Sequence, residues 1–134
     1  GRAGLMPAPY RGGCLCGAIR YEATAAPLAT GYCHCSLCRR ATGAPIFLGV
    51  AFPRDSFRLL QGRTRTHASS ARGIRHFCGE CGSALFFELI DKPKQWEVLI
   101  GSLDDASDIE PTIHVCVSSG VGWLQIADGL PRRP

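Results

Sequence analysis

The sequence lacks any hydrophobic run that is long enough to cross a bilayer. Its longest apolar stretch runs from Ala44 to Phe52 and is interrupted by Pro45 and Gly49, whereas a membrane-spanning helix needs about 20 apolar residues. The start of the chain also lacks the basic, apolar and small-residue order of a secretory signal. We therefore expect a cytoplasmic protein with no membrane partner.

Several functional motifs are missing as well. There is no glycine-rich phosphate loop, no Ser/His/Asp order and no basic stripe with interleaved aromatic residues. The formal net charge of +4 counts every cysteine as neutral. Seven zinc-bound thiolates and two Zn²⁺ ions would lower this charge to about +1, which argues against nucleic acid as a partner.

Helical periodicity is weak throughout the chain, and short apolar runs alternate with turn residues instead. This pattern is typical of a mainly β domain. We expect short helical turns at 36–42 and 104–109, and Trp96 and Trp123 in the core. The predicted strands are 18–23, 46–52, 57–61, 74–77, 84–89, 96–100, 114–117 and 123–126.

A length of 134 residues suits a single domain. We place this domain at 12–131 and expect 1–11 to be a disordered or expression-derived N-terminus. The sequence gives no indication of the oligomeric state.

The eight cysteines carry the strongest signal. A disulfide framework usually spreads its cysteines along the chain, but here neighbours lie one or two residues apart, where a bridge would close a small strained ring. Close spacing instead lets two thiolates on one turn reach one metal ion. Seven cysteines form the motifs C-L-C, C-H-C-S-L-C and C-G-E-C, at Cys14 and Cys16, at Cys33, Cys35 and Cys38, and at Cys78 and Cys81.

The first and third motifs together supply four sulfur atoms, which is the ligand set of a closed tetrahedral zinc site. Glycines follow both motifs and permit the tight turns that direct backbone N–H groups toward sulfur. We predict one structural Zn²⁺ bound by this four-cysteine cluster, which consists of Cys14, Cys16, Cys78 and Cys81. The alternative is four free cysteines buried as small hydrophobic residues.

The second motif, which we call the three-cysteine cluster, has no obvious fourth ligand. A zinc ion with three protein ligands and one open position is typical of a catalytic site. We therefore predict a second, more weakly held Zn²⁺ that is partly lost during purification. The alternative is a closed site that His34, His114 or Cys116 completes. The cluster consists of Cys33, Cys35 and Cys38.

Some neighbouring residues are candidates for substrate contacts. Arg39 and Arg40 directly follow the three-cysteine cluster and would neutralise the thiolates, bind a ligand carboxylate or remain solvated surface charges. His114 opens a predicted strand, where a hydrogen-bonding role is more common than metal ligation. His67 is expected to be exposed, and His76 is expected to be an ordinary strand residue.

With these motifs the sequence resembles the glutathione-dependent formaldehyde-activating enzyme family, from Gly12 to Pro131. One departure is Cys116, where a bulky apolar residue is usual. Buried packing is its expected role, and a spare ligand for the second zinc is the alternative. The resemblance rests on residues 13–22 (GCLCGAIRYE), 33–40 (CHCSLCRR), 77–83 (FCGECGS), 111–115 (PTIHV), Trp123 and 128–131 (DGLP).

The resemblance implies a β-tent, a fold of small stacked antiparallel sheets stapled by zinc. It also implies a carbon–sulfur lyase that joins or splits glutathione and formaldehyde as a hemithioacetal, with catalytic zinc on Cys33, Cys35 and Cys38. On this basis Arg39 or Arg40 would orient glutathione carboxylates, and His114 would shuttle a proton. The alternatives are another thiol or aldehyde at the same site, or a non-catalytic zinc-stabilised binding module, since the domain also resembles part of a centromere-associated protein.

Overall fold

The computed structural model describes residues 9–134. Within this range the chain is mainly β, as predicted, with a single α-helix and three short 3-10 helices η1 (Arg54–Ser56), η2 (Ile100–Ser102) and η3 (Val117–Ser119). The other elements are β1 (Tyr10–Gly13), β2 (Arg20–Ala23), β3 (Ala29–Cys33), α1 (Ser36–Thr42), β4 (Phe47–Pro53), β5 (Phe57–Gln61), β6 (Thr64–Ala68), β7 (Gly73–Cys78), β8 (Ala84–Leu89), β9 (Gln95–Leu99) and β10 (Ile113–Val115).

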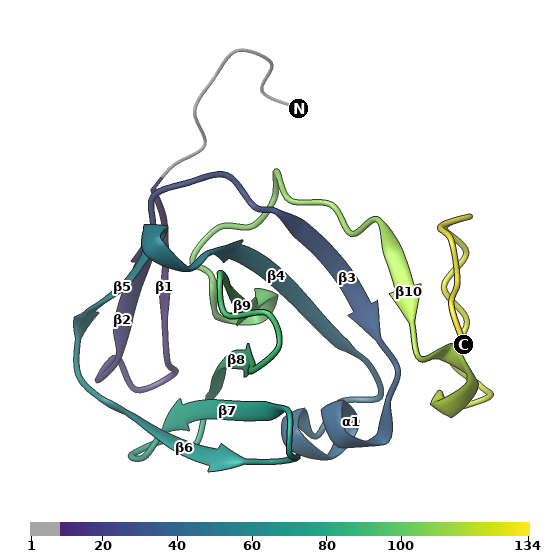
Figure 1. Cartoon of the computed structure of the whole chain (residues 1–134), viewed down its shortest axis with the longest axis horizontal. Coiled ribbons are helices and arrows are strands. Elements are labelled where there is room, and N and C mark those ends of the chain that lie inside the picture. Colours follow the sequence, from purple (N-terminus) through teal and green to yellow (C-terminus); the bar gives the residue numbers. More distant parts are fainter. Residues whose placement is uncertain (1–8) are drawn as a thin grey trace.

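The strands form two sheets. A three-stranded antiparallel sheet has the order β1-β2-β5, and a seven-stranded sheet has the order β10-β3-β4-β9-β8-β7-β6. In the larger sheet β10 pairs with β3 in parallel, whereas the other neighbours are antiparallel. Figure 1 shows this sheet curving from β10 and β3 round to β7 and β6, with the chain after β10 running alongside that strand.

The hydrophobic core joins the two sheets. Side chains alternate between the faces of a strand, and Val50, Phe52 and Val98 on β4 and β9 share one core cluster with Tyr21 of the small sheet. The Tyr21 ring meets Phe86 of β8 edge to face, with ring centroids 4.9 Å apart, a favoured aromatic geometry. The opposite face of β4 and β9 is therefore free to line a cavity.

Helix α1 is short and is fixed at both ends. Cys35 is its N-cap, and the Cys35 sulfur accepts a hydrogen bond from the Cys38 backbone N–H at 3.3 Å. At the other end Gly43 adopts a left-handed conformation with φ 70° and donates to the Arg39 carbonyl, a common helix stop. The cap therefore places two cysteines of one motif next to each other.

The structure corrects several sequence expectations. Residues 123–126 form no strand, and Trp123 is 73% exposed, so it is not a core residue. Trp96 is buried, as expected. Residues 104–109 form a turn rather than a helix, because the Asp105 carboxylate accepts from the Ser107 backbone N–H at 2.9 Å and so closes a turn of its own.

The start of the described chain also differs from expectation. β1 begins at Tyr10, inside the segment expected to be disordered, and the rest of that prediction concerns residues 1–8, which lie outside the described residues. Three strands were missed, namely β1, β3 and β6. Among residues 9–134, no helix is long and apolar enough to span a membrane.

Candidate metal centres and adjoining cavity

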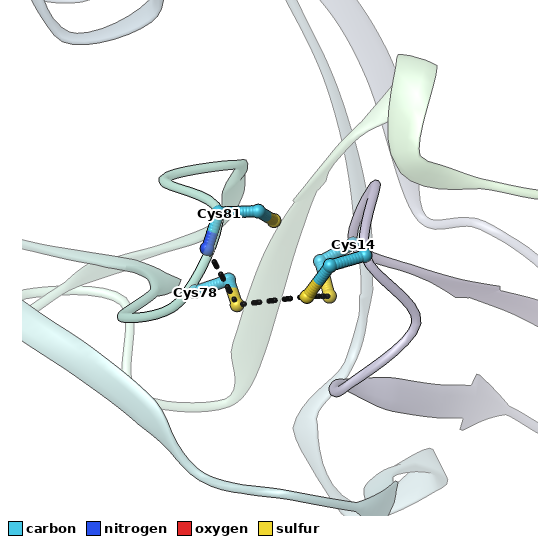
Figure 2. A group of neighbouring side chains, drawn as sticks. Cys14, Cys78 and Cys81 are labelled. Carbon is cyan, nitrogen blue, oxygen red and sulfur yellow. Dashed lines mark hydrogen bonds between the residues drawn. The ribbon is translucent and has the colours of Figure 1, made fainter.

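The four-cysteine cluster forms where two turns from distant parts of the chain meet. One turn follows β1 and carries Cys14 and Cys16, and the other links β7 to β8 and carries Cys78 and Cys81. Figure 2 shows the labelled Cys14 facing Cys78 and Cys81 across the gap between the turns. The predicted pairing of the first and third motifs is thus present in the structure.

The sulfur geometry of this cluster fits a zinc ion. The four Sγ atoms all lie within 4.8 Å of one another, and the Sγ atom of Cys16 lies 3.6 Å from that of Cys14 and 3.8 Å from that of Cys78. With Zn–S bonds of about 2.3 Å, the edge of a tetrahedral site is about 3.8 Å. Disulfide sulfurs would be only about 2.05 Å apart, so these thiols are not paired with each other.

Backbone amides surround these sulfurs. The Ile19 N–H donates to Cys14 Sγ at 3.2 Å, and the Glu80 N–H donates to Cys78 Sγ at 3.4 Å. The turns tighten at glycines with positive φ, 83° at Gly17 and 78° at Gly82, a conformation that glycine adopts without a steric penalty. Both loops are therefore shaped to stabilise thiolate charge in the way that metal sites require.

The three-cysteine cluster lies at the end of β3 and the start of α1. The Sγ atoms of Cys33, Cys35 and Cys38 all lie within 4.8 Å of one another, so this set too is able to hold a metal ion. Hydrogen bonding to Cys33, then to Cys35 and Arg75, lowers the pKa of Cys38 to about 6. Cys38 is therefore readily available as thiolate, the form that binds metal, whereas hydrogen bonding to Cys38 and burial raise the pKa of Cys33.

A fourth protein ligand is not among the described residues of this group. Neither His34, His114 nor Cys116 joins the three sulfurs that lie within 4.8 Å of one another. The His34 imidazole is instead bonded to His114, with Nε2 and Nδ1 2.9 Å apart. In this conformation the three-cysteine cluster offers three possible ligands, the number that a zinc site with an open position would require.

A cavity of about 460 Å³ adjoins the three-cysteine cluster. Its wall includes all three cysteines, and its floor is the face of the large sheet opposite the core. Small residues make this floor deep: Gly31 pairs with Gly49, and Ala29 pairs with Ala51, across β3 and β4. The cysteine sulfurs therefore border a space large enough for a small organic substrate.

Three cationic side chains line this cavity, namely Arg72, Arg75 and Lys92. The Arg75 guanidinium donates to Cys38 Sγ at 3.7 Å and lies 4.5 Å above the Phe87 ring centroid. Its Nε also donates to the Ser69 hydroxyl at 2.9 Å. These contacts hold one positive charge at the border between the cluster and the cavity.

Glu97 is the acidic residue of the cavity wall. Its carboxylate lies over Gly49, since a Cβ atom at Gly49 would overlap Glu97 Oε1. Burial, reinforced by the negative charge of Cys38, raises the pKa of Glu97 to about 6. A carboxyl group with this pKa is able to exchange protons near neutral pH.

The arginines predicted from the motif lie elsewhere. Neither Arg39 nor Arg40 is part of the cavity wall among the described residues. The Arg39 guanidinium donates to the Ser119 carbonyl at 3.2 Å, and Arg40 is exposed. A substrate carboxylate in the cavity would therefore meet Arg72, Arg75 and Lys92 instead.

His114 also lies outside the cavity. Its neighbours Ile113 and Val115 line the wall, whereas His114 faces the other side of β10, as strand alternation requires. It is only 1% exposed and donates from Nε2 to the Asp128 carboxylate at 2.7 Å. This placement gives no support to direct proton transfer from His114 to a substrate in the cavity.

Sequence reasoning missed the cavity residues because their placement depends on strand pairing. Arg75 lies in a correctly predicted strand, and the side chains before and after it point to the opposite face of the sheet. The sequence does not show which of the two faces adjoins the cysteines. Glu97 reaches the cluster only through the pairing of β9 with β4. The one usable signal was a glycine at position 49 inside an apolar run, which is unusual in a strand unless another group approaches closely.

Comparisons with known proteins agree with the cysteine pattern. The model of the glutathione-dependent formaldehyde-activating enzyme family matches residues 9–119. A Halomonas elongata protein named "Putative glutathione-dependent formaldehyde-activating enzyme" is 26% identical over 129 residues, which are 86% of this chain and 79% of that protein. An uncharacterized lyase of Schizosaccharomyces pombe is 32% identical over 78 residues, which are 58% of this chain and 56% of that protein.

The fold also has a counterpart among solved structures. A crystal structure of a Rhodobacter sphaeroides protein matches with a TM-score of 0.62 and 19% sequence identity. The match covers 91% of this chain and 98% of that chain. At this identity the likeness concerns the fold alone.

Proposed function

Because the chain belongs to the glutathione-dependent formaldehyde-activating enzyme family, we propose that it is a carbon–sulfur lyase that joins or splits a thiol and an aldehyde. The family expected from the cysteine motifs is thereby confirmed. Glutathione and formaldehyde are the proposed substrate pair, and the cavity beside the three-cysteine cluster is the proposed reaction site. The observation that carries the proposal is the position of three cysteine sulfurs in the wall of that cavity.

Zinc is the proposed metal at both clusters, because all-thiolate ligand sets at these sulfur spacings suit it. Bound at the three-cysteine cluster, zinc would lower the pKa of an incoming thiol so that a nucleophilic thiolate exists at neutral pH. The four-cysteine cluster, already closed by four ligands, has the structural role. Reduced cysteines are typical of a reducing compartment, which supports a cytoplasmic location.

The cationic side chains of the wall are suited to the other end of the thiol. Glutathione carries two carboxylates, and Arg72, Arg75 and Lys92 line the cavity. Arginine pairs with carboxylates through two parallel hydrogen bonds, which fix orientation as well as position. Binding there would hold the thiol sulfur toward the cysteines, and positioning of this kind accelerates a bimolecular reaction strongly.

Proton balance assigns a role to Glu97. Forming the hemithioacetal makes one carbon–sulfur bond, removes the thiol proton and leaves an alkoxide oxygen that must gain one proton. The Glu97 carboxylate, on the cavity wall with its pKa raised to about 6, would accept the first proton and donate it to the oxygen. In the reverse direction the same carboxylate takes the hydroxyl proton as the carbon–sulfur bond breaks.

Replacement of Cys35 by serine tests the reaction site. The serine hydroxyl still caps α1, because serine is a favoured N-cap residue, so the fold should persist while catalysed exchange between formaldehyde and glutathione, measured by NMR, is lost. Cys116→Ser is the matched control, since Cys116 lines the same cavity but lies outside the cluster. Unchanged exchange in Cys35→Ser would refute the assignment of the site.

The alternative remains a non-catalytic zinc-stabilised binding module. A panel of thiols with formaldehyde separates the two functions, because the enzyme should accelerate exchange for at least one thiol. No acceleration with any thiol, for zinc-loaded wild-type protein, would favour the binding module. Acceleration with a thiol other than glutathione would keep the reaction class and change the substrate.

A further inference from the structure

A chain of hydrogen bonds, buried at its two histidines, links the three-cysteine cluster to residues near position 130. His34 Nε2 and His114 Nδ1 are 2.9 Å apart, and His114 Nε2 is 2.7 Å from Asp128 Oδ2. His34 is 9% exposed and His114 only 1%. Polar groups buried to this extent are costly unless paired, so the two histidines depend on each other and on the more exposed Asp128.

This chain of hydrogen bonds begins within the three-cysteine cluster itself. His34 stands between two cysteines of the cluster, and both Cys33 and Cys35 line the cavity, whereas His34 does not. The His34 side chain therefore points to the opposite side of the turn. Its backbone is also held, because its N–H donates to the Val115 carbonyl at 3.1 Å. Any displacement of the His34 backbone would also move the cysteines on either side of it.

The positions of the ring protons on His34 and His114 follow from Asp128, at the far end of this chain of hydrogen bonds. Asp128 Oδ1 accepts from the Leu130 N–H at 3.0 Å, so the carboxylate is fixed as an acceptor, and its hydrogen bond from His114 lowers the pKa of Asp128. His114 therefore carries its proton on Nε2. In a neutral imidazole this leaves Nδ1 as an acceptor, which the Nε2–H of His34 satisfies. Each group thus fixes the orientation of the next.

Packing leaves the two rings little freedom. Tyr32 stacks on His114 with centroids 4.5 Å apart and an interplanar angle of 16°. On the other side of the pair, a Cβ atom at Gly120 would lie only 3.0 Å from His34 Nδ1. The backbone after β10 closes the arrangement, since His114 N–H donates to the Pro131 carbonyl at 2.9 Å and Arg133 N–H donates to His114 O at 2.9 Å.

We propose that Asp128 and His114 are positioning residues which, through His34, set the directions of the Cys33 and Cys35 sulfurs and thereby the metal affinity of the three-cysteine cluster. The segment 128–133 thus controls the affinity of one metal centre and leaves the other unchanged. The proposal requires that the three-cysteine cluster binds a metal ion, and it does not depend on which reaction the protein catalyses.

Cobalt titration of the full chain tests this directly. Co²⁺ bound by thiolates gives charge-transfer and ligand-field bands that report each cluster, and its affinity is measured without any substrate. Asp128→Asn and His114→Gln should weaken binding at the three-cysteine cluster about ten- to a hundred-fold, the usual effect of losing a residue that orients a ligand. Binding at the four-cysteine cluster should remain as in the wild type.

Two comparisons make the result specific. Asp55→Asn removes the same charge from an exposed acidic residue and should leave both affinities unchanged. His114→Asn, with a shorter amide that does not reach both partners, should weaken binding more than His114→Gln does. Wild-type cobalt affinity at the three-cysteine cluster in both Asp128→Asn and His114→Gln would overturn the proposal.

The four-cysteine cluster acts as an internal reference. Unfolding would lower cobalt affinity at both clusters, whereas a specific effect would lower it at the three-cysteine cluster alone. If the first variants lose both metals, the milder Tyr32→Leu is measured, because it removes the stack on His114 while retaining every hydrogen bond. Selective weakening at the three-cysteine cluster then supports the proposal, and equal affinity or equal loss at both clusters refutes it. Failure of catalysed exchange with intact cobalt affinity would instead count against the proposed reaction.

Discussion

Gly31 on β3 lies directly opposite Gly49 on β4, and neither member of this pair adds a side chain to the floor of the cavity. A Cβ atom at Gly49 would lie 2.6 Å from Phe47 Cε1 and would also overlap the Glu97 carboxylate. Glycine weakens a strand interior, so its presence in two paired strands is explained by the space that it leaves.

Gly49→Ala should destabilise the protein and displace Glu97. Overpacking of this kind costs about 1–3 kcal/mol, which urea unfolding measures, and the proposed exchange activity should fall because the carboxylate moves. Gly101→Ala is the control, since a Cβ atom there meets no neighbour within 4 Å. Equal stability of the two variants would contradict the assigned cause.

Glu97→Gln should reduce the rate constant of thiol–aldehyde exchange about a hundred-fold, the lower range for loss of a general acid–base group. Glutamine keeps the shape of the side chain, so the zinc content and the KM for the thiol should change little. Steady-state kinetics with zinc analysis on the same samples provides the measurement. A raised KM with an unchanged rate constant would instead assign Glu97 to binding a substrate ammonium group.

Arg75→Ala should raise the KM for a thiol that carries carboxylates about ten-fold, because a charge-assisted hydrogen bond contributes about 1.5–3 kcal/mol. A small neutral thiol should be affected much less. Arg40→Ala is the matched control, as Arg40 is exposed and outside the cavity wall. If Arg40→Ala raised the KM and Arg75→Ala did not, the motif-based prediction for Arg40 would be right and the cavity assignment wrong.

Mild chelation should remove the two metals in sequence. The three-cysteine cluster offers three ligands and the four-cysteine cluster four, so the former should lose its ion first. Loss of the second ion should unfold the protein, because that cluster joins the turn after β1 to the turn after β7. Native mass spectrometry combined with circular dichroism follows both steps, and simultaneous loss of the two ions would be inconsistent with this order.

Acid should weaken the fold partly through Glu22. Its carboxylate, only 5% exposed, pairs with Arg58 at 2.8 Å and Arg11 at 3.3 Å, and hydrogen bonding to Arg58, then to Arg11, lowers its pKa below 4.5. A folded-state pKa below the unfolded value adds stability above pH 4.5, and this stability is lost as the pH falls through the folded pKa.

Urea midpoints measured across this acidic range check the prediction for Glu22. Glu22→Gln should be less stable than the wild type at neutral pH and should show a smaller loss on acidification. The control is Glu110→Gln, which replaces an exposed carboxyl group. A wild-type pH profile in Glu22→Gln would show that the ion pairs contribute no pH-dependent stability.

The parts of the structure that depend on local sequence were predictable. Cysteines one or two residues apart must share a turn, so the pattern alone indicated both metal clusters, and the residues of β5, β8 and α1 were predicted with their observed bounds. Trp123 was misplaced because an apolar side chain does not reveal by itself whether another element covers it. β6 was missed because its side chains are mostly exposed, which leaves no alternating pattern.

The cavity could not be predicted because it exists only after strands pair. Phe87, Glu97 and Arg75 come from three strands that meet side by side in the large sheet, and no spacing in the sequence relates them to Cys38. The same holds for His114 and Asp128, whose partnership with His34 depends on the parallel pairing of β10 with β3. Such parallel neighbours are always far apart along the chain.

The parallel pairing of β10 with β3 also affects the order in which the two cysteine clusters are completed during synthesis. All four cysteines of the four-cysteine cluster have left the ribosome once residue 81 is free, so a nascent chain would be able to take up the proposed first ion early. The imidazole and the carboxylate that continue the hydrogen-bond chain from His34 belong to His114 and Asp128 and are synthesised much later. If both clusters bind zinc as proposed, metal loading should proceed in two stages during translation, and the proposed reaction site should be completed last.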